Sequence, residues 1–233
     1  MTNPSYSLVL HFSPRPNRVG IVNGFLSAWN TKNHLPFLRF GRSGPGQVMS
    51  AERIESYLTG PVSTDGFNLS FRTSRAKKEV VALQFLFSAP DHADWFQYNY
   101  CVVDFFTNAI DQKEDGFSAQ ELAGLFISCS SASPIAFGYV SAEVELTWQV
   151  LKDIDRDAAS SPLHSIFHWL TYVPSSFRSF VEKRSRERNL GILTLAECHD
   201  GGAVMGLDGG PPLDRAAHKQ RVLHVSRELE LIP

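Results

Sequence analysis

The sequence is poor in the residues that mark several large protein classes. It has only 3 cysteines in 233 residues, Cys101, Cys129 and Cys198, and none of them lies in a CxxC pair. An odd, widely spaced set of this kind is typical of reduced, buried thiols rather than of a disulfide framework. Charged residues make up 20% of the chain and the net charge is −2, which argues against a protein dedicated to nucleic acids. We therefore expect a reducing compartment and no nucleic-acid partner.

The chain also has few features that direct a protein to a membrane. Residues 1–12 have neither the cationic start nor the apolar run of a secretory signal. The longest uncharged run, residues 122–142, contains five serines and Pro134 and lacks sustained apolar character. Together with the cysteine usage, this predicts a cytoplasmic protein without a membrane partner.

What is present is an ordinary hydrophobic fraction of 43%, enough to fold residues 1–233 as a single domain. Apolar residues spaced at i, i+3, i+4 and i+7 predict a helix over residues 18–32. Ser118 and Glu121 form the pattern of a capping box, which predicts a helix that begins there. Pro174 is expected to start a short helix, and Asp214 to cap a C-terminal one.

Strand patterns alternate with these helices. The sequence predicts strands at residues 5–12, 37–40, 67–71, 80–87, 95–106, 135–148, 164–172, 190–196 and 203–207. Asp200-Gly201 is a favoured turn pair between the last two. The pattern favours an α+β fold with flanking helices on a largely antiparallel sheet, or on two sheets. The stretches that follow Ser50 and Ser118 resemble each other loosely, which suggests a weak internal duplication.

The motifs of catalysis and ligand binding are incomplete in this chain. Glycines at residues 41–46 lack the Lys-Ser/Thr pair of a phosphate loop. Residues 153–164 have the aspartate spacing of a calcium loop, but Ala158 and His164 stand where Gly and Glu are needed. The remaining candidates for an acid, a base or a metal ligand are His164, His168 and His199. His164 and His168 would lie about 13 Å apart on a strand. We expect no catalytic residues, no metal and no cofactor.

The charges are distributed unevenly along the chain. Residues 1–90 contain ten Lys/Arg and four Asp/Glu, residues 91–177 contain three and twelve, and residues 178–233 contain nine and eight. An acidic surface can steer a basic partner protein and orient it, whereas the simpler interpretation is a set of solvated loops and helix caps. The residues that we assign to partner binding are Asp91, Asp94, Asp111, Glu114, Asp115, Asp153, Asp155 and Asp157.

One segment near the C-terminus is similar to a known family. Residues 169–174, Trp-Leu-Thr-Tyr-Val-Pro, are followed by the expected helix and by a hairpin that contains Gly201-Gly202-Ala203-Val204. This arrangement resembles the C-terminal part of bacterial polymorphic-toxin immunity proteins, of the kind associated with type VI secretion. The opening strand, the helix up to Lys32 and residues 37–43 look similar too, so the resemblance extends loosely over most of the chain.

The resemblance implies a non-enzymatic protein that binds one cognate toxin in the cytosol and blocks its active site. The motif residues Trp169, Tyr172 and Pro174 are expected to hold the fold rather than to touch the toxin. The acidic middle of the chain would then face a basic surface of the toxin. Two other functions remain open: an enzyme that uses His164, His168 and His199, and an adaptor of a secretion apparatus.

Overall fold

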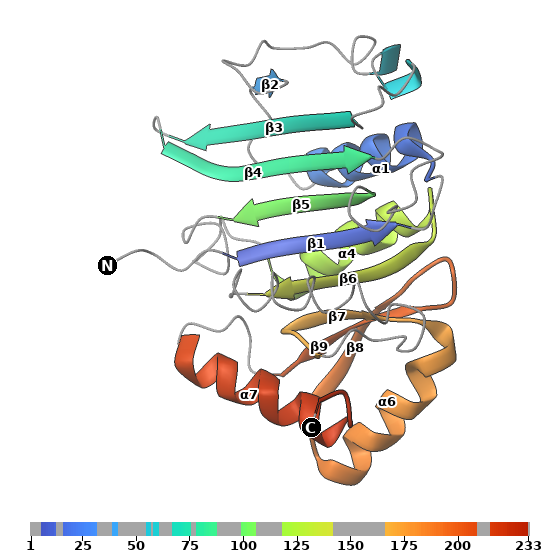
Figure 1. Ribbon diagram of the computed structural model, residues 1–233, viewed down its shortest axis with the longest axis vertical. Helices are drawn as coiled ribbons and strands as arrows, with labels where there is room; N and C mark the ends of the chain where they lie inside the picture. The colour runs from blue at the N-terminus through green and yellow to red at the C-terminus, as the bar shows by residue number, and fades with distance from the viewer. Residues whose placement is uncertain are drawn as a thin grey trace.

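The chain forms an antiparallel β-sheet with helices on both faces (Figure 1). The structure is a computed structural model that describes residues 6–12, 16–31, 39–41, 55–56, 58–60, 67–75, 78–87, 99–105, 118–141, 166–208 and 215–232. The strands are β1 (Tyr6–Phe12), β2 (Arg39–Gly41), β3 (Phe67–Arg75), β4 (Lys78–Phe87), β5 (Tyr100–Phe105), β6 (Ile135–Ser141), β7 (Leu170–Val173), β8 (Ile192–Glu197) and β9 (Ala203–Leu207). The helices are α1 (Arg18–Thr31), α4 (Ala119–Ser130), α6 (Ser175–Arg188) and α7 (Arg215–Glu228).

The described strands lie in one sheet of nine, in the order β2-β3-β4-β5-β1-β6-β7-β9-β8. Every neighbouring pair is antiparallel. The first strand of the chain, β1, therefore lies in the middle of the sheet, between β5 and β6. The predicted α+β fold with an antiparallel sheet is confirmed, and the described strands form one sheet rather than two.

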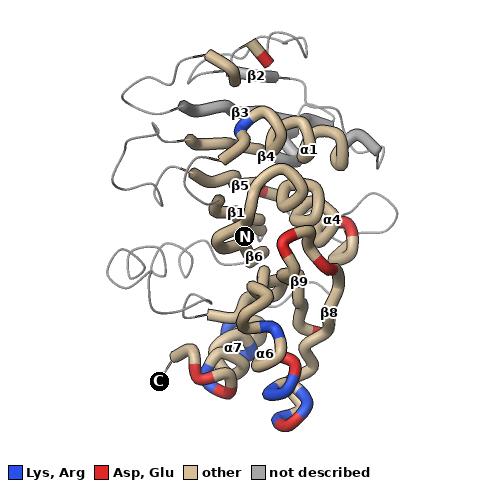
Figure 2. Tube along the Cα trace, turned by 90° about the vertical axis from the view of Figure 1, so that its right-hand side faces the viewer, with Lys and Arg blue, Asp and Glu red and all other residues tan. Residues whose placement is uncertain are grey.

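Two helical crossovers determine which face each helix covers. Because all neighbours are antiparallel, strands an even number of positions apart run in the same direction, so β1 is parallel to β2 and β7 to β8. Helix α1 joins the first pair and α6 the second, and the two connections run in opposite directions along the sheet. Right-handed crossovers then place α1 and α6 on opposite faces. Figure 2 shows this arrangement, with α1 and α4 on one side of the strands and α6 and α7 on the other.

The helices α1 and α4 form the first layer and α6 and α7 the second, and the predicted helix patterns are confirmed in the first layer. Val22, Phe25 and Trp29 of α1 are buried, as their common helical face requires. At the start of α4, Ser118 Oγ accepts a hydrogen bond from the Glu121 amide (3.2 Å), and the Ser118 amide donates to Glu121 Oε2 (2.9 Å). Both halves of the capping box are therefore formed.

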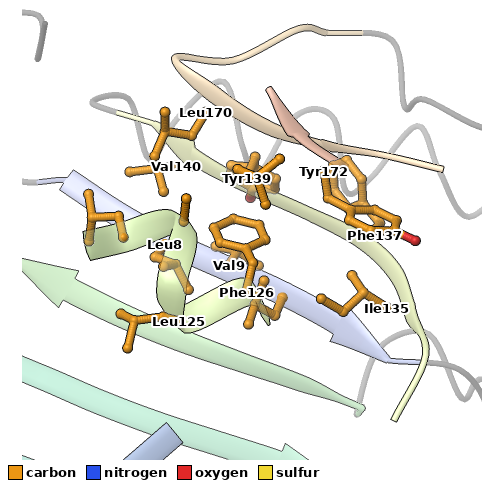
Figure 3. Packing of buried hydrophobic residues seen from close by; sticks show 14 of the residues in the cluster. Leu8, Val9, Leu125, Phe126, Ile135, Phe137, Tyr139, Val140, Leu170 and Tyr172 are labelled. Carbon is orange, nitrogen blue, oxygen red and sulfur yellow. The ribbon is translucent and has the colours of Figure 1, made fainter. Parts of the chain in front are cut away.

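Helix α4 packs closely on the centre of the sheet. Its Phe126 ring lies among side chains of β1 and β6 (Figure 3). A Cβ at Gly138 of β6 would come within 2.8 Å of both Leu10 and Phe126. The glycine therefore allows this approach of helix and strand, because any larger residue would push the two apart.

Of the strand predicted over residues 164–172, residues 166–169 are not in a strand, since β7 begins only at Leu170. The amide of Phe167 donates to Ser226 Oγ (2.8 Å) and the amide of His168 to Thr171 Oγ1 (2.9 Å). Side chains thus take the hydrogen bonds that a sheet ladder would use. His164, and residues 142–148 of the strand predicted before it, lie outside the described residues.

The C-terminal elements follow the prediction with small shifts. Pro174 is the N-cap of α6 rather than its first helical residue, and the helix is 14 residues long instead of short. β8 and β9 form the predicted hairpin, but residues 198–202 connect them, so the loop is longer than a two-residue turn. Within it, Gly201 has a φ of 82°, which glycine tolerates best. Asp214 and Ser50 lie outside the described residues.

Candidate partner-binding surface

Two acidic residues of the segment 91–177 lie in the described part, and both serve the fold. Asp104 on β5 accepts a hydrogen bond from Ser7 Oγ on β1 (2.7 Å). Glu121 caps α4. The residues assigned to partner binding, Asp91, Asp94, Asp111, Glu114, Asp115, Asp153, Asp155 and Asp157, all lie outside the described residues. Their role stays a prediction.

Two residues of the segments that resemble immunity proteins, Tyr172 and Gly202, contact each other and Asp200 at the loop between β8 and β9. Tyr172 Oη donates to Asp200 Oδ2 (2.9 Å), and the Gly202 amide donates to Asp200 Oδ1 (3.1 Å). A Cβ at Gly202 would lie 2.5 Å from the Tyr172 hydroxyl oxygen, so the ring requires glycine there. Burial, and next the hydrogen bond to Asp200, raise the pKa of Tyr172. The hydroxyl stays protonated at neutral pH and keeps donating to the loop.

The same loop is tied at two further points. The Cys198 amide donates to the Gly202 carbonyl (2.8 Å), which closes the hairpin. The His199 amide approaches Ser130 Oγ at the end of α4 (3.4 Å). The His199 side chain itself is exposed. Loop 198–202 is therefore an ordered surface feature, held from β7 and from α4.

The other two motif residues flank β7: Trp169 directly precedes the strand and Pro174 directly follows it. Trp169 is 2% exposed and packs edge-on against Tyr6, with ring centroids 6.1 Å apart. The Pro174 carbonyl accepts from the amides of Phe177 (3.0 Å) and Arg178 (3.1 Å), which begins α6. These contacts are internal to the fold.

The histidines proposed for the enzyme alternative lie in different surroundings. His168 is fully buried and stacks on Tyr139 with a centroid distance of 4.3 Å. His199 is exposed in loop 198–202. A fully buried imidazole cannot reach a substrate at the surface, so His168 and His199 do not form one accessible site.

The cysteines lie in the core rather than at a reactive site. Cys101, Cys129 and Cys198 are all buried and free. Burial raises the pKa of Cys129 to about 12 and that of Cys198 to about 11. Thiols with such pKa values stay protonated at neutral pH, and the thiolate is the form that attacks or binds a metal.

Ion pairs connect the helices of the second layer. Arg184 on α6 donates from Nε to the Glu228 carbonyl at the end of α7 (3.0 Å) and pairs with Glu230. Arg188 lies 3.7 Å from Glu228. Arg178 pairs with Glu182 (2.8 Å) on its own helix and with Glu197 of β8 (2.7 Å). Figure 2 shows these charges gathered on α6 and α7.

A strand edge lies near α6 in the described part of the sheet, and no pattern in the sequence predicts it. β8 is the last described strand of the sheet, with Leu193 53% exposed and Thr194 exposed beside it. The alternation of residues 190–196 predicts a strand but does not say which neighbours it has. A strand at an edge and a strand inside a sheet can have the same pattern.

The described residues include no candidate for a membrane span or a metal centre. No described helix has both the length and the apolar character that a bilayer span requires. Nor do the described His, Cys, Asp and Glu residues contain a group of three or more arranged to hold a metal ion.

The same fold occurs in a solved structure. Over 97% of its length, this chain is similar to the Pseudomonas aeruginosa T6SS protein PA0821, with a TM-score of 0.57 and 11% sequence identity. The likeness covers 77% of that protein. At this identity the comparison shows a shared fold. No family model matches the sequence, and no curated protein matches it.

Proposed function

We propose that this protein is an immunity protein that binds a cognate bacterial toxin and neutralises it by direct contact that blocks the toxin's active site. The observation that carries the proposal is the fold shared, over 97% of the chain, with a T6SS protein. The resemblance of residues 169–174 and 201–204 to immunity proteins associated with type VI secretion supports the same assignment. Both likenesses support an association with type VI secretion.

The physical properties of the described surface are compatible with inhibition by binding. A stable protein complex needs about 1,600 Å² of buried surface and a few well-placed anchors, but no catalytic group. Loop 198–202 is held in one conformation by Tyr172 and Ser130. An ordered surface binds with a smaller loss of conformational entropy than a flexible one. The predicted acidic residues would add electrostatic steering toward a basic toxin.

The proposal is tested by capture of the partner followed by a toxicity assay. The tagged protein is incubated at low salt with a lysate of its own host, and bound proteins are identified by mass spectrometry. We expect one stoichiometric partner that stops growth when produced alone and is harmless when produced with this protein. Association should slow about tenfold or more as salt rises, because the acidic steering is screened.

Other outcomes would contradict the proposal in distinct ways. A harmless partner that is a component of the secretion apparatus would favour the adaptor. A bound metal or small molecule without a protein partner would favour an enzyme.

A further inference from the structure

The two halves of the sheet follow the same path through space. In the first half, β1 is followed by α1, by the strands β2 to β5 and then by α4. The strand β5 pairs with β1 on one side and with β4 on the other. In the second, β7 leads through α6 to β8 and β9, β9 pairs with β7, and α7 follows. The helices of each half share one face (Figure 2). By this correspondence, β8 occupies the place of β4.

The correspondence exposes one difference between the halves. β3 pairs with the outer edge of β4 along nine residue positions, and β2 continues the sheet beyond it. At the equivalent outer edge of β8, no strand of the described part is present. The second half therefore ends where the first half accepts a further antiparallel strand.

Hydrogen-bond directions show which groups β8 presents at this edge. The Asp208 amide donates to the Gly191 carbonyl (2.8 Å), so Gly191, and by alternation Leu193, face β9. Ile192 and Thr194 then point their backbone groups away from β9. This agrees with the Ile192 amide, which donates to Ser185 Oγ of α6 (3.3 Å). The N–H and C=O of Thr194 are consequently directed at the open edge.

The edge is only partly protected against an added strand. Leu195 is the extra residue of a bulge, and its carbonyl accepts from Gln120 Nε2 of α4 (2.9 Å). Beyond the bulge, the bonded pair of Cys198 and Gly202 implies that Glu197 again faces outward. Natural edges are commonly protected by Lys or Pro, and β8 contains neither. The backbone groups of Thr194 and Glu197 are thus available for hydrogen bonds with an added strand.

The stripe of α6 that reaches β8 contains two basic residues. Arg178, Glu182 and Arg186 form one i, i+4 stripe of α6, and Arg178 reaches Glu197 of β8. Arg186 donates to the Glu182 carbonyl (3.2 Å) and is exposed. Among the described residues, no carboxylate lies within ion-pair distance of Arg186.

From these observations, we propose that the outer edge of β8 binds an extended segment of the partner protein as an added antiparallel strand, with an acidic side chain of that segment next to Arg186. This inference rests on the proposed function, since the segment belongs to the toxin. Strand addition of this kind obtains affinity from main-chain hydrogen bonds and specificity from alternate side chains. Leu193 would supply an apolar contact on one face.

Charge disfavours a second copy of this chain as the occupant. Antiparallel pairing of β8 with its own copy has a two-fold axis perpendicular to the sheet, which brings the two α6 helices side by side. Each α6 has the exposed Arg186, which has no described carboxylate within ion-pair distance, so two copies would bring like charges together along this face. An acidic partner segment has no such conflict.

The test compares two substitutions at one edge position. Thr194→Pro removes the outward N–H, and proline is tolerated at a sheet edge. Thr194→Ala keeps the N–H and serves as the matched control. The probe is the toxic protein captured by the wild-type chain, and its dissociation constant is measured by titration calorimetry. We expect Thr194→Pro to weaken binding about tenfold or more and Thr194→Ala about twofold or less. Arg186→Glu should weaken binding about fivefold.

A second measurement uses the wild-type protein, so its result does not depend on whether the Thr194→Pro variant folds. Amide hydrogen exchange is compared for the free chain and the complex, and we expect protection of Thr194 and Glu197 on binding. Wild-type affinity in Thr194→Pro together with unprotected amides would overturn the edge assignment and leave the immunity function standing. Failure of the wild-type chain to bind any toxic protein would overturn both. Dimerisation of the free chain that Thr194→Pro abolishes would show that a second copy is the occupant.

Discussion

The two helix layers of the sheet are built from different kinds of sequence. α1 and α4 contain one charged residue each, Arg18 and Glu121, whereas α6 contains seven in 14 residues and α7 five in 14. α4 buries six of its residues, but α6 buries only Val181 and Ser185. The first layer is therefore attached to the sheet by apolar packing. The second combines a narrow buried strip with ion pairs and side-chain hydrogen bonds.

This difference shows that similar arrangements of helix and strand can be stabilised in two ways. Apolar burial is insensitive to moderate salt and to pH. Exposed ion pairs weaken as salt screens them, and a buried histidine makes stability depend on pH. The two layers should therefore respond differently to the same perturbations.

The largest expected effect is the difference in stability lost when a buried phenylalanine of the first layer and a partly exposed one of the second are replaced by alanine. Phe126 of α4 is fully buried, and Phe126→Ala should lower the free energy of unfolding by about 3–5 kcal/mol, because it leaves a cavity. Phe180 of α6 is 38% exposed, and Phe180→Ala should lower it by about 1 kcal/mol or less. Urea unfolding followed by circular dichroism measures both. Equal losses would show that the second layer depends on apolar packing as much as the first.

The next effect is acid sensitivity of the second layer. His218 of α7 is buried, and burial lowers its pKa from 6.5 to about 4. Between these values the unfolded chain binds the proton and the folded chain does not, so stability falls as pH drops from 6.5 toward 4 and levels off below it. The loss by pH 5 should be about 2 kcal/mol.

The control for this prediction is a second histidine of the same helix. His224 is exposed, and His224→Gln serves as the matched control substitution. His218→Gln should flatten the dependence of the unfolding free energy on pH between pH 7 and 5. If both variants keep the slope of the wild type, His218 is not its origin.

The smallest effect concerns the contacts between α6 and α7. Arg184 binds the end of α7 through the Glu228 carbonyl and Glu230. Arg184→Met should lower the free energy of unfolding by about 1 kcal/mol at low salt and by less at 1 M salt. Arg186→Met should have almost no effect on stability, because Arg186 makes no ion pair with a described carboxylate. An Arg184→Met loss that is unchanged by salt would assign the effect to lost packing of its methylene groups.

Much of the local structure could be predicted from neighbouring residues. The capping box at Ser118 and Glu121 needs only residues three positions apart, and α1 needs only a repeated apolar spacing. The strand predicted over residues 164–172 is absent at residues 166–169, because the amide of Phe167 bonds to Ser226, which is 59 residues away, and the amide of His168 bonds to Thr171. Such a partner leaves no trace in the local pattern.

The candidate site was less predictable than the fold. The uneven charge distribution indicated an acidic surface, and the assigned residues lie outside the described part, so that prediction stays open. The edge at Thr194 had no signal in the sequence, since β8 becomes an edge only through the strand order of the whole sheet. Tyr172 and Gly202 could be noticed in the sequence as a motif, but their contact through Asp200 appears only in three dimensions.

The sequence by itself determined the α+β class, the positions of most helices and strands, and the contrast between apolar and charged helices. These properties depend on short-range periodicity and on the side chains of single elements. The tertiary structure decided the strand order, the faces covered by each helix pair, the burial of His168 and the open edge of β8. Those features depend on crossover handedness and on hydrogen bonds between residues far apart in the chain, which local preferences do not encode.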